Sequence, residues 1–352
     1  MNRLGIVSGA AKENRRSGRR GRVLVTGMAG LVALLLGLTL VIAYIRQPPE
    51  EHGYQSAYLA RAEPQYVDTP VAHFEYLKLG HGEPVVLVPG GGLWLLSYRD
   101  TTPTLAQAST IYAVDLPGQG YTVVKQSDFQ YDLDAMANAL AVFLDAVGVQ
   151  RASLVGHSWG GTWVLVFADR CPERVDRLVL IDAPVLDLPS SWDWRPLEFP
   201  VLGELIGKLM RRSDVERVLR KTFAHQDRVT ADVVDEDWAA LSRADNREAL
   251  WQSQRRIDHA RTQAALDRVR APTLVLWGSE DRFDSASQAA EVGRRIRGAT
   301  VRVLDGCGHA AHEDCPGLAN VELVRFLRDR LESRRLCLRG RTQPGLLPRP
   351  VG

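Results

Sequence analysis

Short apolar runs alternate with amphipathic stretches in two parts of the chain. The runs of strand length are residues 71–79, 84–88, 109–114, 152–155, 175–181, 273–277 and 300–304. Residues 133–147 instead show helical spacing, with one apolar face formed by Met136, Leu140, Phe143 and Leu144. Nearly continuous apolar strands that alternate with helices predict an α/β fold. Its doubly wound sheet is expected to be mostly parallel and covered on both faces.

The alternation stops between residues 184 and 268. This stretch has no strand pattern, and its short helical segments carry Trp192, Trp194, Trp238 and Trp251. We therefore predict a helical cap, residues 184–268, inserted into a core formed by residues 66–183 and 269–333. The tryptophans could line an apolar pocket, although packing inside the cap is the commoner use of such side chains.

The longest apolar segment lies near the N-terminus. Residues 23–45 contain no charged side chain, and a helix of this length can cross the hydrocarbon core of a bilayer. Only Arg46 follows the segment directly, whereas five arginines precede it: Arg15, Arg16, Arg19, Arg20 and Arg22. The positive-inside tendency predicts a single-pass anchor with residues 1–22 in the cytoplasm and the large domain outside it. A cleaved signal peptide, which would leave the domain secreted, is the alternative.

The other segments outside the predicted core and cap are polar. We expect residues 1–22 to lack regular structure, residues 46–65 to form a linker, and residues 334–352 to form a disordered tail. The formal net charge of the chain is only +2, so composition gives no indication of a nucleic-acid partner.

The four cysteines are Cys171, Cys307, Cys315 and Cys337. Disulfides are chemically possible in an exported domain, so a bridge between Cys307 and Cys315 and a set of free thiols both stay open. No pattern resembles a zinc site, and we expect neither a metal nor a cofactor.

A serine stands at a sharp turn between a strand and a helix. The string Gly156-His157-Ser158-Trp159-Gly160-Gly161 follows an apolar run and opens an amphipathic one. A serine at such a turn is exposed at the end of the sheet, and small neighbours allow the turn to form. Ser158 is therefore the predicted nucleophile, facing the N–H groups of the following helix.

A serine hydroxyl needs a base and a group that orients the base. Loops at the carboxyl edge of the same sheet are where these partners are expected. The loop after residues 273–277 offers Asp281 as the favoured acid, with Glu280 and Asp182 as alternatives. The loop after residues 300–304 offers His309 as the favoured base, with His312 as the alternative.

The order Ser158, Asp281, His309 resembles that of the α/β-hydrolase family with a helical cap. The resemblance runs from about residue 66 to residue 331. The matching motifs are Pro89-Gly90-Gly91, Asp115-Leu116-Pro117-Gly118-Gln119-Gly120, the serine turn, Trp277-Gly278-Ser279-Glu280-Asp281, and Gly308-His309 followed by Asp314 and Pro316.

The resemblance also implies an oxyanion hole made of two backbone N–H groups. One belongs to Trp159, the residue after the nucleophile, and the other to Gly91, with Gly92 as an alternative. The chain has Pro89-Gly90 where the family often has His-Gly, a departure that concerns packing of the loop and need not remove the donor. Asp115 and His157 are expected to be structural.

A serine at this turn, where some relatives have aspartate, suits attack on a carbonyl. We expect a membrane-anchored serine hydrolase that cleaves a small, apolar, ester-like substrate through an acyl-enzyme. The alternatives are a carbon–carbon bond hydrolase, a perhydrolase- or haloperoxidase-like enzyme and a proline-iminopeptidase-like enzyme. The usual His-Gly-Gly-Pro-Gly loop of proline iminopeptidases is missing. A catalytically silent binding protein of the same fold is the non-enzymatic alternative, and the oligomeric state stays open.

Overall fold

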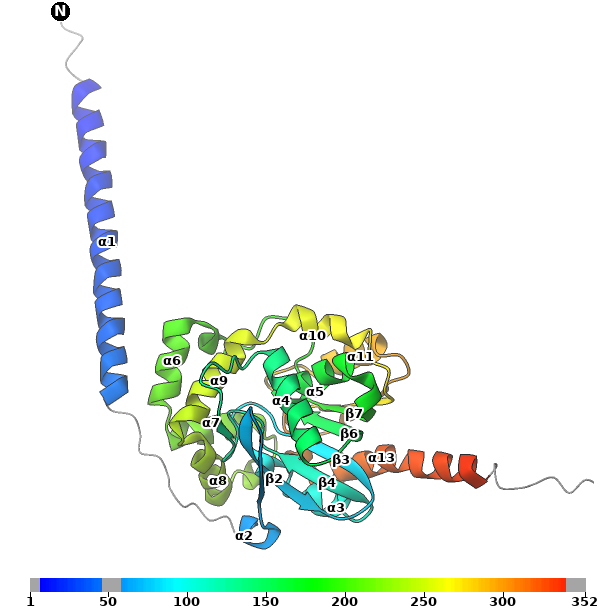
Figure 1. The fold of residues 1–352 in the computed structure, drawn as a ribbon. Coiled ribbons are helices and arrows are strands. Elements are labelled where there is room, and N and C mark those ends of the chain that lie inside the picture. Colours follow the sequence, from blue (N-terminus) through cyan, green and yellow to red (C-terminus); the bar gives the residue numbers. More distant parts are fainter. Residues whose placement is uncertain (1–6, 46–57, 340–352) are drawn as a thin grey trace, which may run out of the picture.

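A nine-stranded sheet forms the centre of the molecule in the computed structural model, which describes residues 7–45 and 58–339 (Figure 1). The strands are β1 Gln65–Asp68, β2 Ala72–Leu79, β3 Glu83–Val88, β4 Ser109–Val114, β5 Val123–Val124, β6 Ala152–His157, β7 Val175–Ile181, β8 Thr273–Gly278 and β9 Thr300–Leu304. Their order is β1-β2-β4-β3-β6-β7-β8-β9, with β5 beside β2. Strands β4, β3, β6, β7, β8 and β9 are parallel, and the pairings of β2 are antiparallel. The predicted α/β class with a mostly parallel sheet is confirmed.

Helices cover both faces of the sheet. The helices of the described chain are α1 Val7–Ile45, α2 Leu59–Ala62, α3 Thr102–Leu105, α4 Leu133–Ala146, α5 Trp159–Arg170, α6 Pro200–Leu209, α7 Arg212–Thr222, α8 Ala231–Leu241, α9 Ala244–Arg256, α10 His259–Leu266, α11 Ser287–Arg295, α12 Ala311–Asp314 and α13 Pro316–Arg339. Successive side chains of β6 point to opposite faces, so Leu154 joins the core under α4 and α5 while Val155 joins the core under α3 and α13.

The chain between β7 and β8 forms a helical layer over the carboxyl edge of the sheet. Helices α6 to α10 lie here, and the described residues of this insertion contain no strand. Its tryptophans differ in environment. Trp238 and Trp251 are buried in the hydrophobic core, whereas Trp192 is 80% exposed and Trp194 is half-buried beside Ser158.

Helix α1 projects from the domain (Figure 1). Its apolar stretch Val25–Ile45 is the part of the described chain that is long and apolar enough to cross a membrane, a property that a signal sequence shares. The end of α1 packs on α6, where the Tyr44 hydroxyl donates to Glu204 Oε1 at 2.5 Å and Lys208 Nζ lies 3.8 Å from the Tyr44 ring centre.

Three expectations about the polar segments need correction. Helix α1 begins at Val7, so residues 7–22 are helical. The expected linker ends earlier, because α2 and the first residue of β1 lie before residue 66; residues 46–57 lie outside the described part. Helix α13 continues to Arg339 into the expected tail, of which residues 340–352 are not described. Extending an existing helix is much easier than starting one, so polar residues without a strong helix breaker continue it.

Candidate active site

The turn between β6 and α5 holds Ser158 in a strained backbone conformation. Its φ is +49°, a left-handed value that is unusual for a residue with a side chain. The turn is tight because a Cβ on Gly156 would lie 2.5 Å from the Gly160 carbonyl oxygen, and one on Gly160 would lie 2.4 Å from that of Val88. The Ser158 N–H donates to the Ile181 carbonyl of β7, which fixes the turn on the sheet. The hydroxyl therefore stands at the carboxyl edge of the sheet.

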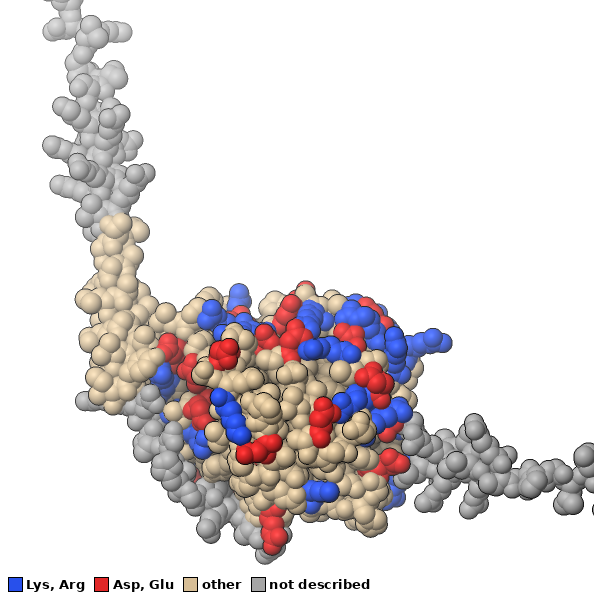
Figure 2. Space-filling view, viewed as in Figure 1, with Lys and Arg blue, Asp and Glu red and all other residues tan. Residues whose placement is uncertain are grey.

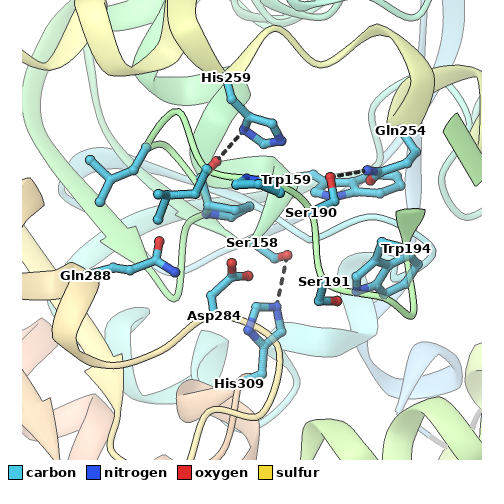
Figure 3. Close-up of a pocket in the computed structure, with 14 residues that line it drawn as sticks. Ser158, Trp159, Ser190, Ser191, Trp194, Gln254, His259, Asp284, Gln288 and His309 are labelled. Atoms are coloured by element: carbon cyan, nitrogen blue, oxygen red, sulfur yellow. Dashed lines mark hydrogen bonds between the residues drawn. The ribbon is translucent and has the colours of Figure 1, made fainter.

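His309 and Asp281 extend from this serine as a chain of contacts. His309 Nε2 lies 3.1 Å from Ser158 Oγ, as Figure 3 shows, and His309 Nδ1 lies 2.8 Å from Asp281 Oδ2. The other oxygen of Asp281 accepts hydrogen bonds from the N–H groups of Phe283 and Asp284 at 2.8 and 2.9 Å. Both side chains are nearly or fully buried, so the geometry of this chain is held by packing as well as by hydrogen bonds.

The alternative residues lie elsewhere. His312 is completely buried, and its Nε2 lies 2.9 Å from Ser97 Oγ. Asp182 accepts from the N–H groups of Gly278 and Ala311, so it joins two loops of the site. Glu280 is exposed to solvent. Among the described residues, only the candidates His309 and Asp281 form a continuous chain of contacts with Ser158.

Carboxylates dominate the electrostatics around His309. Burial lowers the pKa of its imidazole, but the charge and hydrogen bond of Asp281 outweigh burial and raise the pKa to about 9. Asp284 and Asp182 add smaller contributions in the same direction. Burial also raises the pKa of Asp284, to about 6, with the charge of Asp281 adding to the effect. At neutral pH, the site therefore favours a positive imidazole next to Asp281.

Backbone donors lie close to the serine. Trp159 is the first residue of α5, where N–H groups have no partner inside the helix. Gly91 packs directly beneath the Trp159 indole, because a Cβ at Gly91 would lie 1.9 Å from Trp159 Cε3. The residues predicted to form an oxyanion hole are thus in contact. Asp115 supports the glycine loop by accepting the Leu95 N–H at 2.7 Å, and His157 Nε2 lies 3.1 Å from the His309 carbonyl.

The cleft above Ser158 is narrow. Its volume is about 30 Å³, so a substrate must displace side chains of the insertion that line it. The lining includes polar residues that sequence reasoning missed: Gln254, His259, Asp284 and Gln288. Asp284, His309 and Ser158 converge in Figure 3. Asp284 lies three residues after Asp281 in the same loop, a position that could have identified it.

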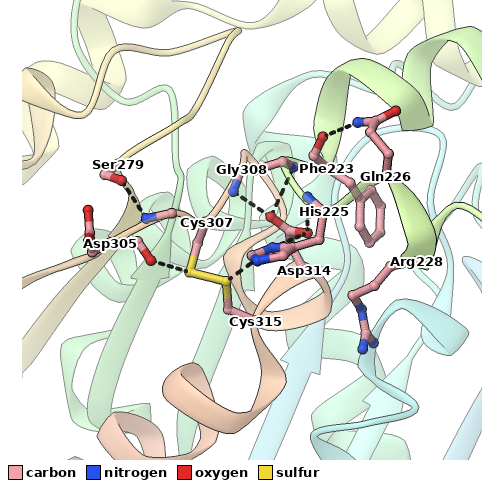
Figure 4. Close-up of polar contacts among 12 residues, drawn as sticks. Phe223, His225, Gln226, Arg228, Ser279, Asp305, Cys307, Gly308, Asp314 and Cys315 are labelled. Carbon is pink, nitrogen blue, oxygen red and sulfur yellow. Dashed lines mark hydrogen bonds and ion pairs between the residues drawn. A yellow bond between two sulfur atoms is a disulfide. The ribbon is translucent and has the colours of Figure 1, made fainter.

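The loop that carries His309 is fixed at both ends. A disulfide joins Cys307 and Cys315, which brackets the histidine, whereas Cys171 is free. The Cys337 side chain lies outside the described part. Asp314 accepts the Gly308 N–H at 2.7 Å and the N–H groups of Ala224 and His225 at 3.0 Å (Figure 4). Asp314 thus connects the histidine loop to the insertion.

Within the described residues, two side-chain groups have ligand atoms close enough to share a metal ion. In the first, Asp281, Asp284 and His309, these atoms lie within 4.8 Å of one another, but His309 Nδ1 and Asp281 Oδ2 already bond to each other. The second group contains Cys315, whose sulfur is in the disulfide. The contacts of the first group favour an acid–base role.

Comparisons with known proteins agree with this geometry. Residues 83–316 match a family described as alpha/beta hydrolase fold. The chain is 30% identical over 266 residues to the 2-hydroxy-6-oxo-6-phenylhexa-2,4-dienoate hydrolase of Comamonas testosteroni. This match covers 72% of this chain and 91% of that hydrolase. It is 28% identical over 269 residues to the pimeloyl-[acyl-carrier protein] methyl ester esterase of Neisseria meningitidis. This match covers 75% of this chain and 81% of the esterase.

A solved structure described as a membrane phospholipase A, a bacterial virulence factor, has the same fold. The superposition has a TM-score of 0.66 and 23% sequence identity, and it covers 90% of this chain and 98% of that structure. At this identity the likeness concerns the fold alone.

Proposed function

Because the chain belongs to the alpha/beta hydrolase fold family, we propose that it is a serine hydrolase in which Ser158, His309 and Asp281 form the catalytic triad. The continuous contact from Ser158 Oγ through the imidazole to the Asp281 carboxylate carries this proposal. A serine hydroxyl alone is a weak nucleophile, and this arrangement supplies both the base and the group that orients it.

Each residue has a definite role in the proposed reaction. Ser158 Oγ attacks the substrate carbonyl while His309 Nε2 takes its proton. Asp281 holds the Nδ1 proton toward itself and stabilises the imidazolium. The N–H groups of Trp159 and Gly91 would donate to the oxyanion of the tetrahedral intermediate. His309 then gives the proton to the leaving alcohol, and water releases the acid from Ser158 in the second half of the reaction.

The charge of the cleft favours a neutral ester over the dienoate of the Comamonas relative. A dienoate carries a carboxylate, which needs a cationic partner when it is buried. Among the described residues that line the cleft, none is lysine or arginine, and the cationic ring of His309 is already paired with Asp281. Asp284 also contributes a carboxylate with a pKa of about 6. The adjacent anion would repel a second one at neutral pH. Cleavage of a carbon–carbon bond in a dienoate is therefore the second candidate function.

The proposed location is the outer side of a membrane, with α1 as the anchor. The span Val25–Ile45 is uncharged, and most of its large apolar side chains are exposed. The preceding arginines favour a cytoplasmic N-terminus. The disulfide between Cys307 and Cys315 suits an oxidising compartment, which agrees with an exported domain.

A fluorophosphonate probe tests the nucleophile. The full-length protein should become labelled, and Ser158→Ala should remove both labelling and turnover, with a loss of about a millionfold in kcat. Asp281→Asn should lower kcat by about four orders of magnitude because the imidazole loses its orientation. His312→Ala serves as the comparison. If it, and not His309→Ala, abolishes turnover of correctly folded protein, the base is misassigned.

A substrate panel tests the type of bond. Neutral p-nitrophenyl esters of increasing chain length are compared with 2-hydroxy-6-oxo-6-phenylhexa-2,4-dienoate, the substrate in the name of the Comamonas relative. We expect ester turnover and little cleavage of the dienoate. Asp284→Asn removes the carboxylate and should improve use of the dienoate more than use of the esters. Preference of the wild-type protein for the dienoate would favour the carbon–carbon hydrolase instead.

A further inference from the structure

An apolar groove lies outside the catalytic cleft, between the end of α1 and helices α6 and α7. It has a volume of about 670 Å³. Its lining includes six aliphatic side chains: Leu197, Leu202, Leu205, Ile206, Leu209 and Val218. Charged side chains of α7, Arg217 and Lys221, also line it, paired with Asp214 and Asp193. The groove therefore combines an apolar wall with charged groups.

The groove is continuous with the apolar surface of α1. Thr39 lines it and also belongs to the span Val25–Ile45, six residues before its end. Phe199 and Leu202, at the start of α6, are 55% and 42% exposed. In Figure 2 the tan surface of α1 adjoins the domain, with acidic and basic side chains also present at the contact. If α1 spans a bilayer, Thr39 places part of this groove wall at the level of the lipid chains.

Two aromatic side chains that line the groove, Trp194 and Phe283, connect it to the catalytic cleft and to the histidine. Trp194 lines both the groove and the cleft at Ser158. Its ring centre is 5.8 Å from that of Phe283, which is in turn 5.2 Å from that of His309. Trp194 also packs against Trp159 at 5.5 Å. Moving the Trp194 side chain would join the two spaces.

We propose that this groove binds an acyl chain of a membrane glycerolipid and that displacement of Trp194 brings the ester of that lipid to Ser158. The inference rests on the proposed function and names its substrate class. A lipid fits because a side chain of the proposed membrane-spanning helix forms part of a largely apolar groove wall. It also accounts for the narrow cleft at Ser158. Acylation of Ser158 releases the lysolipid, which takes its proton from His309, and water then releases the fatty acid from Ser158.

Photo-crosslinking tests occupancy of the groove independently of catalysis. Full-length Ser158→Ala protein is placed in dioleoylphosphatidylcholine vesicles that contain a phosphatidylcholine with a diazirine on its acyl chain. We expect lipid adducts on peptides from α6 and α7 as well as on α1. Adducts confined to α1 would overturn the proposal. Protein–protein crosslinks through α6 and α7 in place of lipid adducts would show that a second copy covers the groove.

A pair of double variants tests the link to activity. Leu202→Gln with Leu209→Gln makes the groove polar at two partly exposed positions, and Leu318→Gln with Val321→Gln makes the same change on exposed positions of α13. The measured quantity is the rate on phosphatidylcholine vesicles divided by the rate on p-nitrophenyl acetate.

The groove variant should lower this ratio by about tenfold, since two apolar contacts with the chain are lost. The α13 variant should leave the ratio at the wild-type value. An unchanged ratio in the groove variant overturns the acyl-chain site. Absence of p-nitrophenyl acetate turnover by the wild-type protein would instead contradict the proposed function, so the two failures are distinguishable.

Discussion

At the scale of single residues, His309 is surrounded by negative charge. Asp281 bonds to its Nδ1 atom, and Asp284 and Asp182 also favour the protonated ring. Together they raise the pKa of His309 to about 9. A general base must be neutral to accept a proton. Asp281 orients the His309 ring, so its charge cannot be removed without moving that ring. Asp284 only adds negative charge from within the cleft, and a substitution can remove this charge separately.

The pH profile of ester hydrolysis should report this charge. We expect kcat/KM of the free enzyme to rise with pH up to about 9, where His309 becomes neutral. Asp284→Asn removes a negative charge, which lowers the pKa of His309 and moves the rising limb to lower pH. The matched control is Asp305→Asn, which removes an exposed carboxylate directly after β9 and should leave the rising limb at the wild-type pH. If the rising limb of the Asp284→Asn profile stays at the wild-type pH, the Asp284 charge does not raise the pKa of His309.

At the scale of elements, the segment from β9 to α13 decides where the histidine lies. The disulfide joins its two ends, and Asp314 ties it to the chain after α7. The His309 N–H also donates to the Thr222 carbonyl at the end of α7. The histidine loop and the insertion are thus one hydrogen-bonded unit, so a change in the loop affects both stability and activity.

Removing the disulfide tests this unit. Cys307→Ser with Cys315→Ser should lower the free energy of unfolding by about 2–3 kcal/mol, the loop-closure entropy of a short loop. Turnover of a soluble ester should fall as well, because the histidine is less well held. Cys171→Ser is the control, since Cys171 is free. Equal unfolding transitions of the wild-type protein with and without dithiothreitol would show that the bridge contributes nothing.

At the scale of the whole molecule, one sheet edge collects the proposed reacting groups, and one helix, α1, is the proposed membrane anchor. Ser158, Asp281 and His309 follow β6, β8 and β9, which are parallel and end at the same edge. The insertion covers this edge, and α1 packs against α6 of the insertion. The proposed anchor therefore touches the part of the protein that must move to admit substrate.

Reporter fusions test the proposed topology. Alkaline phosphatase, which is active only after export, should be active when fused after Arg46, and the full-length protein should stay in the membrane after alkaline carbonate extraction. Both results follow from an uncleaved span with arginines on its cytoplasmic side. An inactive fusion would reverse the orientation, and a mature N-terminus beyond Ile45 would show that the segment is a signal peptide.

The sequence by itself determined the strands of the core and the turn that carries Ser158. These are local properties: apolar periodicity follows from which face of an element is buried, and the tight turn requires small residues at Gly156 and Gly160. The short strands β1 and β5 and the helical continuation beyond residue 333 were missed, because edge pairing and helix propagation leave weak patterns in a sequence.

Only the tertiary structure decided which residues meet. His309 and His312 are three positions apart, yet one faces Ser158 and the other Ser97. The position of Asp284 in the cleft and the groove beside Thr39 likewise depend on elements that are distant along the chain. The pairing of Cys307 with Cys315 depends on how the loop between them is folded. Spacing in a sequence selects candidate residues, but contact depends on the direction of each side chain, which the packing of the whole fold sets.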